Sequence, residues 1–490
     1  MTTFTAADIP RVRDACLQAL HDYNLPGLAI AVVEGEHLLY GEGFGLADIK
    51  GRREMSISHR QRIGSITKTM TALCIMANVD AGQLRLDSPI SELLPDLTFT
   101  GAGNAGDLTI QHLLTHTGGI GEAPTREHLH DPETALWTDS PELLDAPQRY
   151  PDGIEIEVDP GSKWSYANHG FGLLGDILTQ IEEKPLADIF RDRIFRPLEM
   201  RDSDIRDKPH YNLTPGYHRP LTPEDRQNRG NSHLWALDTP PEDDQHIRGG
   251  HIFLPIPAAG AVQSSARDMA RYMGALLQRG ADIVDPATFD EMVKPHWRPH
   301  PRLMGVGLSF MLETRAGHES IGHGGNIAGG WNTELAVFPQ HNLGCILNFN
   351  LDDPNTTPVR AQIMHAVLDS SPEPVPSIPL DSAIVDTAPG LYESIPGDLT
   401  NVRVRWGTGR IQIEQHGDEL ILRSRRGAYA PGLHPNGVPI RPVDASDLNL
   451  FRLMDDSPEP AHIAFVRDTS GRVEGLLMDR AVRMDRADGT

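Results

Sequence analysis

Cysteine is scarce in this chain of 490 residues, which contains only Cys16, Cys74 and Cys345. Small secreted domains rely on paired cysteines, so three distant ones exclude a disulfide framework and indicate a reducing compartment. Long hydrophobic runs are also missing, because the stretch 27–33 is far shorter than the roughly 20 apolar residues that span a bilayer. Residues 1–20 lack the basic and then apolar segments of a secretory signal. We therefore expect a cytoplasmic protein.

Positive charge is in short supply as well. The chain has 68 acidic residues against 44 basic ones, which gives a formal net charge of −24 at pH 7. Because an acidic surface repels phosphate backbones and anionic lipids, we expect no nucleic-acid partner and no membrane partner. Hydrophobic residues make up 39% of the chain, which is enough for a sizeable core and excludes a disordered or collagen-like protein.

A proline-rich segment divides the chain. Four prolines fall within residues 372–379, and such a segment is stiff and extended. It predicts a first domain of residues 1–369, a linker of residues 370–379 and a second domain of residues 380–490. The second domain shows strand alternation, for example at 402–406, which indicates a small all-β barrel or sandwich.

The first domain mixes helical and strand patterns. Helical spacing and turn residues predict helices over 6–23, 65–81, 110–114, 168–182, 266–279 and 360–369. Strand-like runs are found at 28–33, 38–43, 305–312, 331–338 and 344–349.

The first candidate site is the Ser-x-x-Lys pair of Ser65 and Lys68. Only six of the 44 basic residues are Lys, and a Lys removed from water can give up its proton, whereas an Arg cannot. Side chains three apart on a helix are neighbours, so Lys68 could activate the Ser65 hydroxyl as a nucleophile. The same pair also arises by chance, which makes it a weak signal alone.

Two further segments carry groups suited to catalysis. Tyr166 and Asn168 follow a Pro-Gly turn, where a phenol could move a proton and an amide could bind a carbonyl; the alternative is a turn with Asn168 as a helix cap. His323, Gly325 and Asn326 form a glycine-rich segment at a sheet edge, where peptide N–H groups could face an oxyanion; the alternative is a hairpin turn.

Taken in order, the Ser-x-x-Lys pair, the Tyr-x-Asn pair and the glycine-rich segment resemble the serine β-lactamase and penicillin-binding-protein superfamily over about residues 8–368. The pattern is most similar to class C β-lactamases and to the related carboxylesterases and D-aminopeptidases. Residues 108–119 and 259–269 also look like this family. The resemblance implies an α+β fold, in which an antiparallel sheet flanked by helices faces a helical region, followed by the small all-β C-terminal domain.

The resemblance also implies roles for these residues. Ser65 would be the acylated nucleophile, and Lys68 and Tyr166 would be its proton-transfer partners; either of the two could take the first proton. The chain would then be a serine hydrolase that acts on a small-molecule ester or amide, including D-amino-acid amides or peptides, with β-lactams as a side activity. The alternatives are a sensor that binds an acyl group without turnover, and an acyltransferase. No oligomeric state follows from the sequence.

The substrate-binding residues implied by the resemblance are Asn168, His323, Gly325 and Asn326. The main-chain N–H groups of Ser65 and Asn326 would form the oxyanion hole. His323 stands where β-lactamases usually have a Lys, which binds a substrate carboxylate with a fixed charge. A histidine is mostly neutral at pH 7, so this position favours substrates without that carboxylate and is similar to the D-aminopeptidase branch.

No metal or cofactor is expected. His128, His130 and Asp131 are close in sequence, but no other spaced His or Cys cluster completes a metal site. The sequence also lacks the glycine-rich motifs that bind dinucleotides or nucleoside triphosphates, and the Gly-x-Ser-x-Gly motif of α/β-hydrolases.

Overall fold

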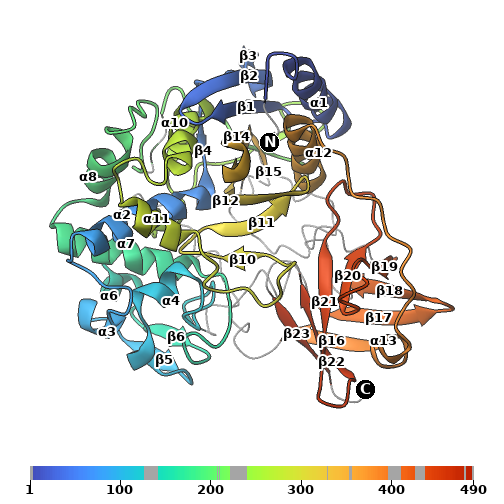
Figure 1. Cartoon of the computed structure of the whole chain (residues 1–490). Helices are drawn as coiled ribbons and strands as arrows, with labels where there is room; N and C mark the ends of the chain where they lie inside the picture. The colour runs from blue at the N-terminus through green and yellow to red at the C-terminus, as the bar shows by residue number, and fades with distance from the viewer. Residues whose placement is uncertain are drawn as a thin grey trace.

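The computed structural model describes residues 4–125, 142–206, 208, 210–220, 240–327, 329–352, 356–394, 410–424, 436–478 and 482–487. A large mixed helix-and-sheet part is followed by a C-terminal barrel (Figure 1). Within the described residues, every helix is too short or too polar to span a bilayer.

An eight-stranded antiparallel sheet lies at the centre of the larger part. Its strands are β1 (Gly27–Glu34), β2 (His37–Asp48), β3 (Arg53–Glu54), β10 (Gly305–Val306), β11 (Met311–Arg315), β12 (His318–Ile327), β13 (Trp331–Phe338) and β14 (Leu343–Phe349), in the order β10-β11-β12-β13-β14-β1-β2-β3. The N-terminal hairpin joins the later strands because β1 pairs with β14, with Leu28 opposite Phe349. Both faces of β1 are covered, so its sequence is apolar from Gly27 to Val33 instead of alternating.

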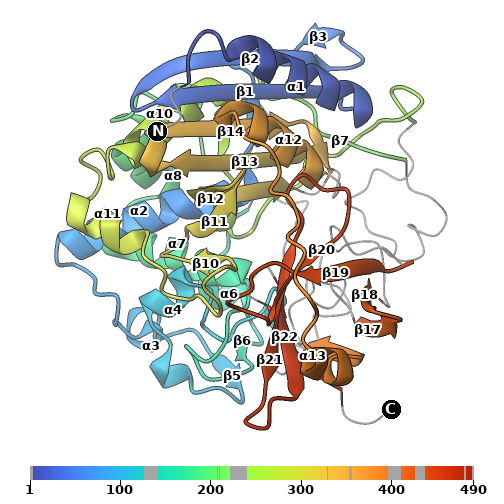
Figure 2. The same cartoon turned by 45° about the vertical axis from the view of Figure 1, so that its right-hand side comes forward.

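Two helices from opposite ends of this part cover one face of the sheet. Figure 2 shows α1 (Ile9–Asp22) and α12 (Thr356–Leu368) side by side in front of the strands. Val12, Cys16 and Ala19 recur at helical spacing and are fully buried against that face.

The other face is covered by α2 (Thr67–Asp80), α10 (Ala266–Leu277) and the helical region. That region contains α3 (Ile90–Leu93), α4 (Ile110–Leu114), α6 (Ala146–Arg149), α7 (Asn168–Glu182), α8 (Leu186–Phe190) and α11 (Pro286–Met292). Short strands form three small sheets beside the main one: β4 (Arg60–Arg62) with β9 (Gln263–Ser265), β5 (Phe99–Gly101) with β6 (Ile154–Ile156), and β7 (Tyr217–His218) with β8 (Ile247–Arg248) and β15 (Leu351–Asp352). Residues 67–78 of α2 are all buried, so neighbours hold this helix on every side.

The C-terminal part is a closed barrel. Its strands are β16 (Gly390–Ser394), β17 (Ile411–His416), β18 (Glu419–Ser424), β19 (Val438–Pro442), β20 (Leu450–Leu453), β21 (His462–Arg467), β22 (Val473–Met478) and β23 (Arg483–Arg486), and the short helix α13 (Ser382–Thr387) precedes them. Closure follows from the pairing of β16 with β23, where Tyr392 lies opposite Arg486. Full closure leaves the sheet without an open edge.

The barrel packs against the larger part. Its core residues form one apolar cluster with Trp164, Tyr166, Met304 and others of the larger part. At the same interface, His300 Nε2 donates to Asp447 Oδ2 at 2.7 Å. The barrel therefore lies beside the segment that carries Tyr166.

The predicted fold class is confirmed: an antiparallel sheet flanked by helices, followed by an all-β domain. Two details were wrong: the helix predicted for 65–81 begins at Thr67, and the run 305–312 forms parts of two strands. Of the two all-β alternatives for the C-terminal domain, the barrel is correct. The predicted strand 402–406 lies outside the described residues. Residues 370–381 contain no helix or strand, while the proposed domain boundaries stay a prediction.

Asp268 supplies a test of how burial contributes to stability. Burial raises the pKa of this carboxyl from 3.8 to about 6. Hydrogen bonds from Ser203 and from the Asp202 main chain act in the opposite direction and lower this pKa, but by less than burial raises it. Between about pH 4 and pH 6 the folded chain holds a proton that the unfolded chain has released, so this group's contribution to stability falls as the pH rises. The free energy of unfolding of Asp268→Asn, taken relative to that of wild type, should therefore increase by on the order of 2 kcal/mol from pH 5 to pH 7. Urea unfolding of both proteins at the two pH values measures this difference, and an equal difference at both would contradict it.

Candidate active site

Ser65 lies in a tight turn directly before α2. Ser65 belongs to the 3-10 turn Gly64–Ile66, so the prediction that it lies on the helix itself was wrong by one turn. The Ser65 side chain is buried. Gly64 has a φ of +53°, and a Cβ at this position would lie 2.7 Å from the main-chain N of Asn326. Only glycine fits there. The turn therefore places Ser65 against β12.

Lys68 is fully buried and joins two of the three motifs. Its Nζ donates to Ser65 Oγ at 2.9 Å, to Asn168 Oδ1 at 2.8 Å and to the carbonyl O of Ala259 at 2.7 Å. The last two oxygens can only accept. A neutral amine has two hydrogens for these acceptors and one lone pair, which would face the Ser65 hydroxyl. The arrangement is thus compatible with Lys68 both before and after it takes a proton.

Tyr166 lies next to this pair. Lys68 Nζ is 4.9 Å from the centre of the Tyr166 ring, and the ring is buried. On β12, the ring of His323 is centred 6.2 Å from that of Tyr166. The structure therefore brings residues from all three sequence motifs together, although they lie as much as 258 positions apart in the chain.

The glycine-rich segment lies inside a strand. The hairpin-turn alternative was wrong, because residues 323–326 lie within β12 and pair with β13. The predicted edge position agrees with the register, since β11 pairs with β12 only as far as Gly322. A Cβ on Gly325 would lie 2.0 Å from the carbonyl O of Ile63 and 2.3 Å from Thr333 Oγ1. Glycine at this position lets β12 approach the turn before Ser65 closely.

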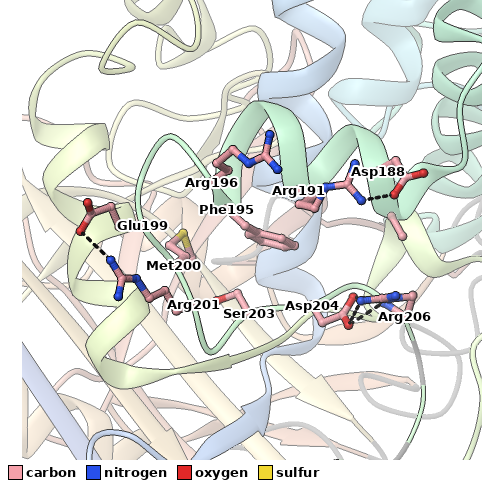
Figure 3. A pocket seen from close by; sticks show the side chains of 11 residues that line it. Asp188, Arg191, Phe195, Arg196, Glu199, Met200, Arg201, Ser203, Asp204 and Arg206 are labelled. Carbon is pink, nitrogen blue, oxygen red and sulfur yellow. Dashed lines mark hydrogen bonds and ion pairs between the residues drawn. The ribbon is translucent and has the colours of Figure 1, made fainter.

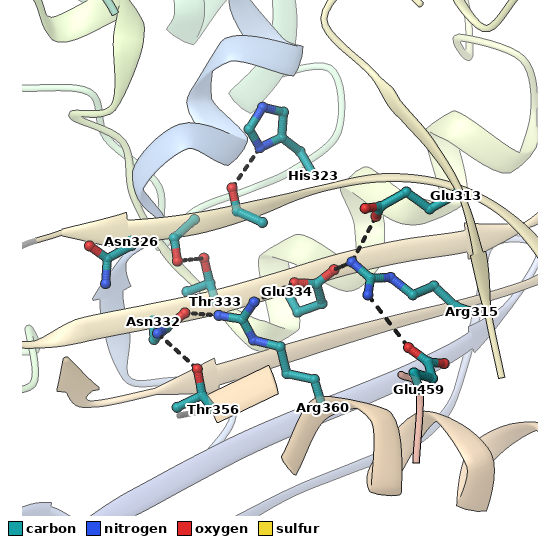
Figure 4. Close-up of polar contacts among 12 residues, drawn as sticks. Glu313, Arg315, His323, Asn326, Asn332, Thr333, Glu334, Thr356, Arg360 and Glu459 are labelled. Atoms are coloured by element: carbon teal, nitrogen blue, oxygen red, sulfur yellow. Dashed lines mark hydrogen bonds and ion pairs between the residues drawn. The ribbon is translucent and has the colours of Figure 1, made fainter. Parts of the chain in front are cut away.

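His323 and Asn326 point in different directions from β12. His323 is buried, and its Nδ1 lies 2.5 Å from the carbonyl O of Gly324 (Figure 4). Since a carbonyl can only accept, Nδ1 carries the proton. The Asn326 amide donates to Asp352 Oδ1 at 2.8 Å, away from Ser65. The main chain of Asn326, in contrast, lies against Gly64.

A network of ion pairs around the buried Glu334 supports β12 and β13 on the opposite face of the sheet. Glu334 accepts from Arg315 at 3.1 Å and from Arg360 at 2.9 Å (Figure 4). Arg315 also reaches Glu459 of the barrel at 3.5 Å. A Cβ on Gly324 would lie 3.2 Å from Glu334 Oε2, so the network lies directly behind the glycine-rich segment. The barrel is thereby linked to the strand that borders Ser65.

A surface cavity of about 420 Å³ lies elsewhere (Figure 3). It is lined by residues between Ala187 and Arg206 and includes none of the predicted site residues. Several of its charged side chains pair with one another, as Asp204 and Arg206 do at 2.8 Å. The hydroxyl of Ser203, which lines it, lies 2.8 Å from both Ser264 Oγ and Asp268 Oδ2 and so belongs to the hydrogen bonds around that buried carboxyl.

His116 and Glu122 were missed as site residues. Both are buried in the loop after α4 and touch the segment that contains Tyr166 and Asn168. The stretch 108–119 showed the family resemblance, but its sequence alone assigns no function to His116. Glu122 lies just beyond that stretch and gave no signal.

Among the described residues, no group of three or more His, Cys, Asp or Glu side chains is arranged to hold a metal ion. The segment with His128, His130 and Asp131 lies outside the described residues.

The sheet, the helical region and the three assembled motifs define a β-lactamase-like fold. A family model described as Beta-lactamase matches residues 13–368, and the chain belongs to this family. The superfamily expected from the three motifs is therefore confirmed.

Curated relatives include enzymes with several hydrolytic activities. The unguisins hydrolase ungD' of Aspergillus campestris is 24% identical over 73% of this chain and 65% of its own length, so this chain spans just under two thirds of it. The D-alanyl-D-alanine-carboxypeptidase/endopeptidase AmpH of Escherichia coli is 26% identical over 66% of this chain and 78% of its own. The esterase EstB of Burkholderia gladioli is 32% identical over 38% and 48%, respectively.

Similarity to solved structures extends through the barrel. The octameric penicillin-binding protein homologue from Pyrococcus abyssi superposes with a TM-score of 0.61 at 20% identity, covering 97% of this chain and 99% of that one. At this identity the match shows a shared fold, which includes the C-terminal domain.

Proposed function

We propose that the protein is a serine hydrolase that forms an acyl-enzyme on Ser65 and hydrolyses a small ester or amide. The observation that carries the proposal is the contact of Lys68 Nζ with both Ser65 Oγ and Asn168 Oδ1. It joins a hydroxyl, a buried amine and an amide beside a phenol, the groups that acyl transfer needs.

The proposed reaction has two halves. Ser65 Oγ attacks the substrate carbonyl carbon while its proton passes to Lys68 Nζ, and the main-chain N–H groups of Ser65 and Asn326 bind the resulting oxyanion. The bond to the leaving group then breaks as that group takes a proton relayed through Lys68 or Tyr166. Water repeats the sequence on the acyl-enzyme, releasing the acid and restoring Ser65. Lys68 is the first base in this scheme because its Nζ is hydrogen-bonded to Ser65 Oγ.

The substrate class follows from the third motif. His323 replaces the fixed positive charge that would hold a substrate carboxylate, so neutral esters and amides rank first, and D-amino-acid amides or peptides second. The names of the relatives, an esterase, a carboxypeptidase/endopeptidase and a hydrolase, support this range. The cytoplasmic location and the expected absence of nucleic-acid and membrane partners stay predictions.

One assay series tests the proposal. The protein is incubated side by side with p-nitrophenyl butyrate, D-alanyl-p-nitroanilide and nitrocefin, and turnover is followed together with intact mass. We expect fastest turnover of the ester and an acyl mass increment on the enzyme. An increment without turnover would favour the sensor alternative, and a new ester formed with added alcohol would favour an acyltransferase. Neither turnover nor an increment, on folded protein, would contradict the proposal.

His323→Lys tests the assignment of substrate class. A Lys at this position would provide a positive charge for a substrate carboxylate, so kcat/KM for carboxylate-bearing esters should rise relative to neutral esters, on the order of tenfold or about 1.4 kcal/mol. Matched ester pairs that differ only in a carboxylate measure this ratio. His323→Gln is the neutral control and should leave the ratio near that of wild type. If the ratio does not change in His323→Lys, this position does not select against the carboxylate.

A further inference from the structure

The loop after α4 touches five consecutive residues around the Tyr-x-Asn motif. At its start, the carbonyl O of His116 accepts from Ser165 N at 2.8 Å, and His116 Nδ1 accepts from Ala167 N at 3.1 Å. The ring of His116 stacks on that of Tyr166, with centroids 4.2 Å apart and an interplanar angle of 27°. One buried residue therefore contacts the residues on both sides of Tyr166 and Tyr166 itself.

Glu122 continues this contact into the start of α7. Its Oε1 accepts from Asn168 Nδ2 at 3.0 Å, and its carbonyl O accepts from His169 Nε2 at 2.8 Å. The first bond orients the Asn168 amide so that Oδ1 faces Lys68 Nζ. The second leaves His169 Nδ1 as the acceptor of the Tyr150 hydroxyl at 2.9 Å. The start of α7 is thereby fixed on two sides.

The backbone of the loop is itself unusual at this point. His116 has a φ of +58°, in the left-handed region that residues other than glycine seldom adopt, although histidine does so more readily than most. Such conformations persist where surrounding contacts hold them, and they concentrate at functional sites. Here the conformation lets one residue present both its carbonyl O and its ring to the segment 165–167.

We propose that His116 and Glu122 are positioning residues that set the place of the Tyr166 phenol and the orientation of the Asn168 amide. This inference rests on the proposed function, because it assigns these residues a task in that reaction. Neither residue touches the reacting atoms. Each acts through a motif residue, so its loss should lower kcat while KM changes little.

Paired substitutions separate the contacts. His116→Asn keeps an acceptor for the Ala167 N–H and tolerates the left-handed backbone, but it loses the stacked ring. His116→Phe keeps a ring and loses the acceptor. Glu122→Gln keeps an acceptor for Asn168 Nδ2, whereas Glu122→Leu does not. The matched control is His246→Asn, because His246 is also buried and hydrogen-bonded but contacts Asp243 and Asn24 instead of the site.

The measurements are kcat and KM for p-nitrophenyl butyrate, the rate at which a fluorophosphonate labels Ser65, and the melting temperature. We expect kcat and labelling to fall about tenfold in His116→Asn, more in His116→Phe, and about tenfold in Glu122→Leu, with near-complete recovery in Glu122→Gln. His246→Asn should lower only the melting temperature. Since Glu122→Gln is nearly isosteric, the Glu122 pair remains a test even if a His116 variant fails to fold.

Two results would overturn the inference in distinguishable ways. If wild-type Ser65 is labelled and turns over the ester, but the folded His116 and Glu122 variants match wild type within twofold, these residues do not position the motif. If wild-type protein neither turns over the ester nor labels at Ser65, the proposed function fails, and the inference fails with it.

Discussion

Ser65→Ala should remove ester turnover almost completely, by about four orders of magnitude or more in kcat. No covalent intermediate can form without the hydroxyl, and only binding and the oxyanion donors remain to assist direct attack by water. Steady-state hydrolysis of p-nitrophenyl butyrate, with enzyme concentration fixed by absorbance, measures the loss. Folding should be unaffected, because the substitution removes one oxygen from a buried turn.

The matched control is Ser162→Ala. Ser162 is an exposed serine on the Pro-Gly turn that precedes Tyr166, and its hydroxyl donates to the carbonyl O of Asp159 at 2.6 Å. This variant should retain wild-type kcat within about twofold. Appreciable turnover by Ser65→Ala, or an equal loss in Ser162→Ala, would contradict the assignment of Ser65 as the nucleophile.

Lys68→Met should lower kcat by about three orders of magnitude. Methionine has a similar length but no proton acceptor, so the Ser65 hydroxyl would lose the base in contact with it. The carbonyl O of Ala259 and Asn168 Oδ1 would also lose a donor, while a buried charge-bearing group disappears. These effects on folding oppose each other, so we expect a small change in melting temperature beside a large change in kcat.

Lys68→Arg separates the charge of Lys68 from its basicity. Arg retains a positive charge but cannot give up its proton at any working pH. If Lys68 acts as the base, Arg should be nearly as inactive as Met. Lys184→Met, which changes an exposed lysine, is the control and should behave as wild type. Recovery of Lys68→Arg to within tenfold of wild type would mean that the charge alone is required.

The sequence predicted the fold best where local signals and burial agree. The helix predicted for 168–182 matches α7 because its apolar residues recur at helical spacing and are buried together in the structure. The run 305–312 splits into two strands because its two ends pair with each other, Gly305 opposite Leu312. Val306 also bonds to the main chain of Trp297, a contact that no local pattern reveals. Barrel closure likewise depends on the pairing of two strands about 90 residues apart.

The candidate site was predictable because the order of its three motifs along the chain is informative, even though each motif alone is a weak signal of function. Residue types and spacing indicated Ser65, Lys68 and Asn168, whose contacts bridge 100 positions. The contacts of His116 and Glu122 with this motif were not predictable in this way. A left-handed backbone at a histidine and a carboxylate that orients an amide are visible only once the chain has folded.

The most direct test of the account is to identify the residue that carries the acyl group during turnover. Wild-type protein is quenched with acid seconds after mixing with p-nitrophenyl butyrate, digested and analysed by peptide mass spectrometry. We predict a butyryl group on the peptide that contains Ser65, absent from Ser65→Ala and lost with time as the ester is consumed. Continued turnover with the acyl group on another residue would contradict the account.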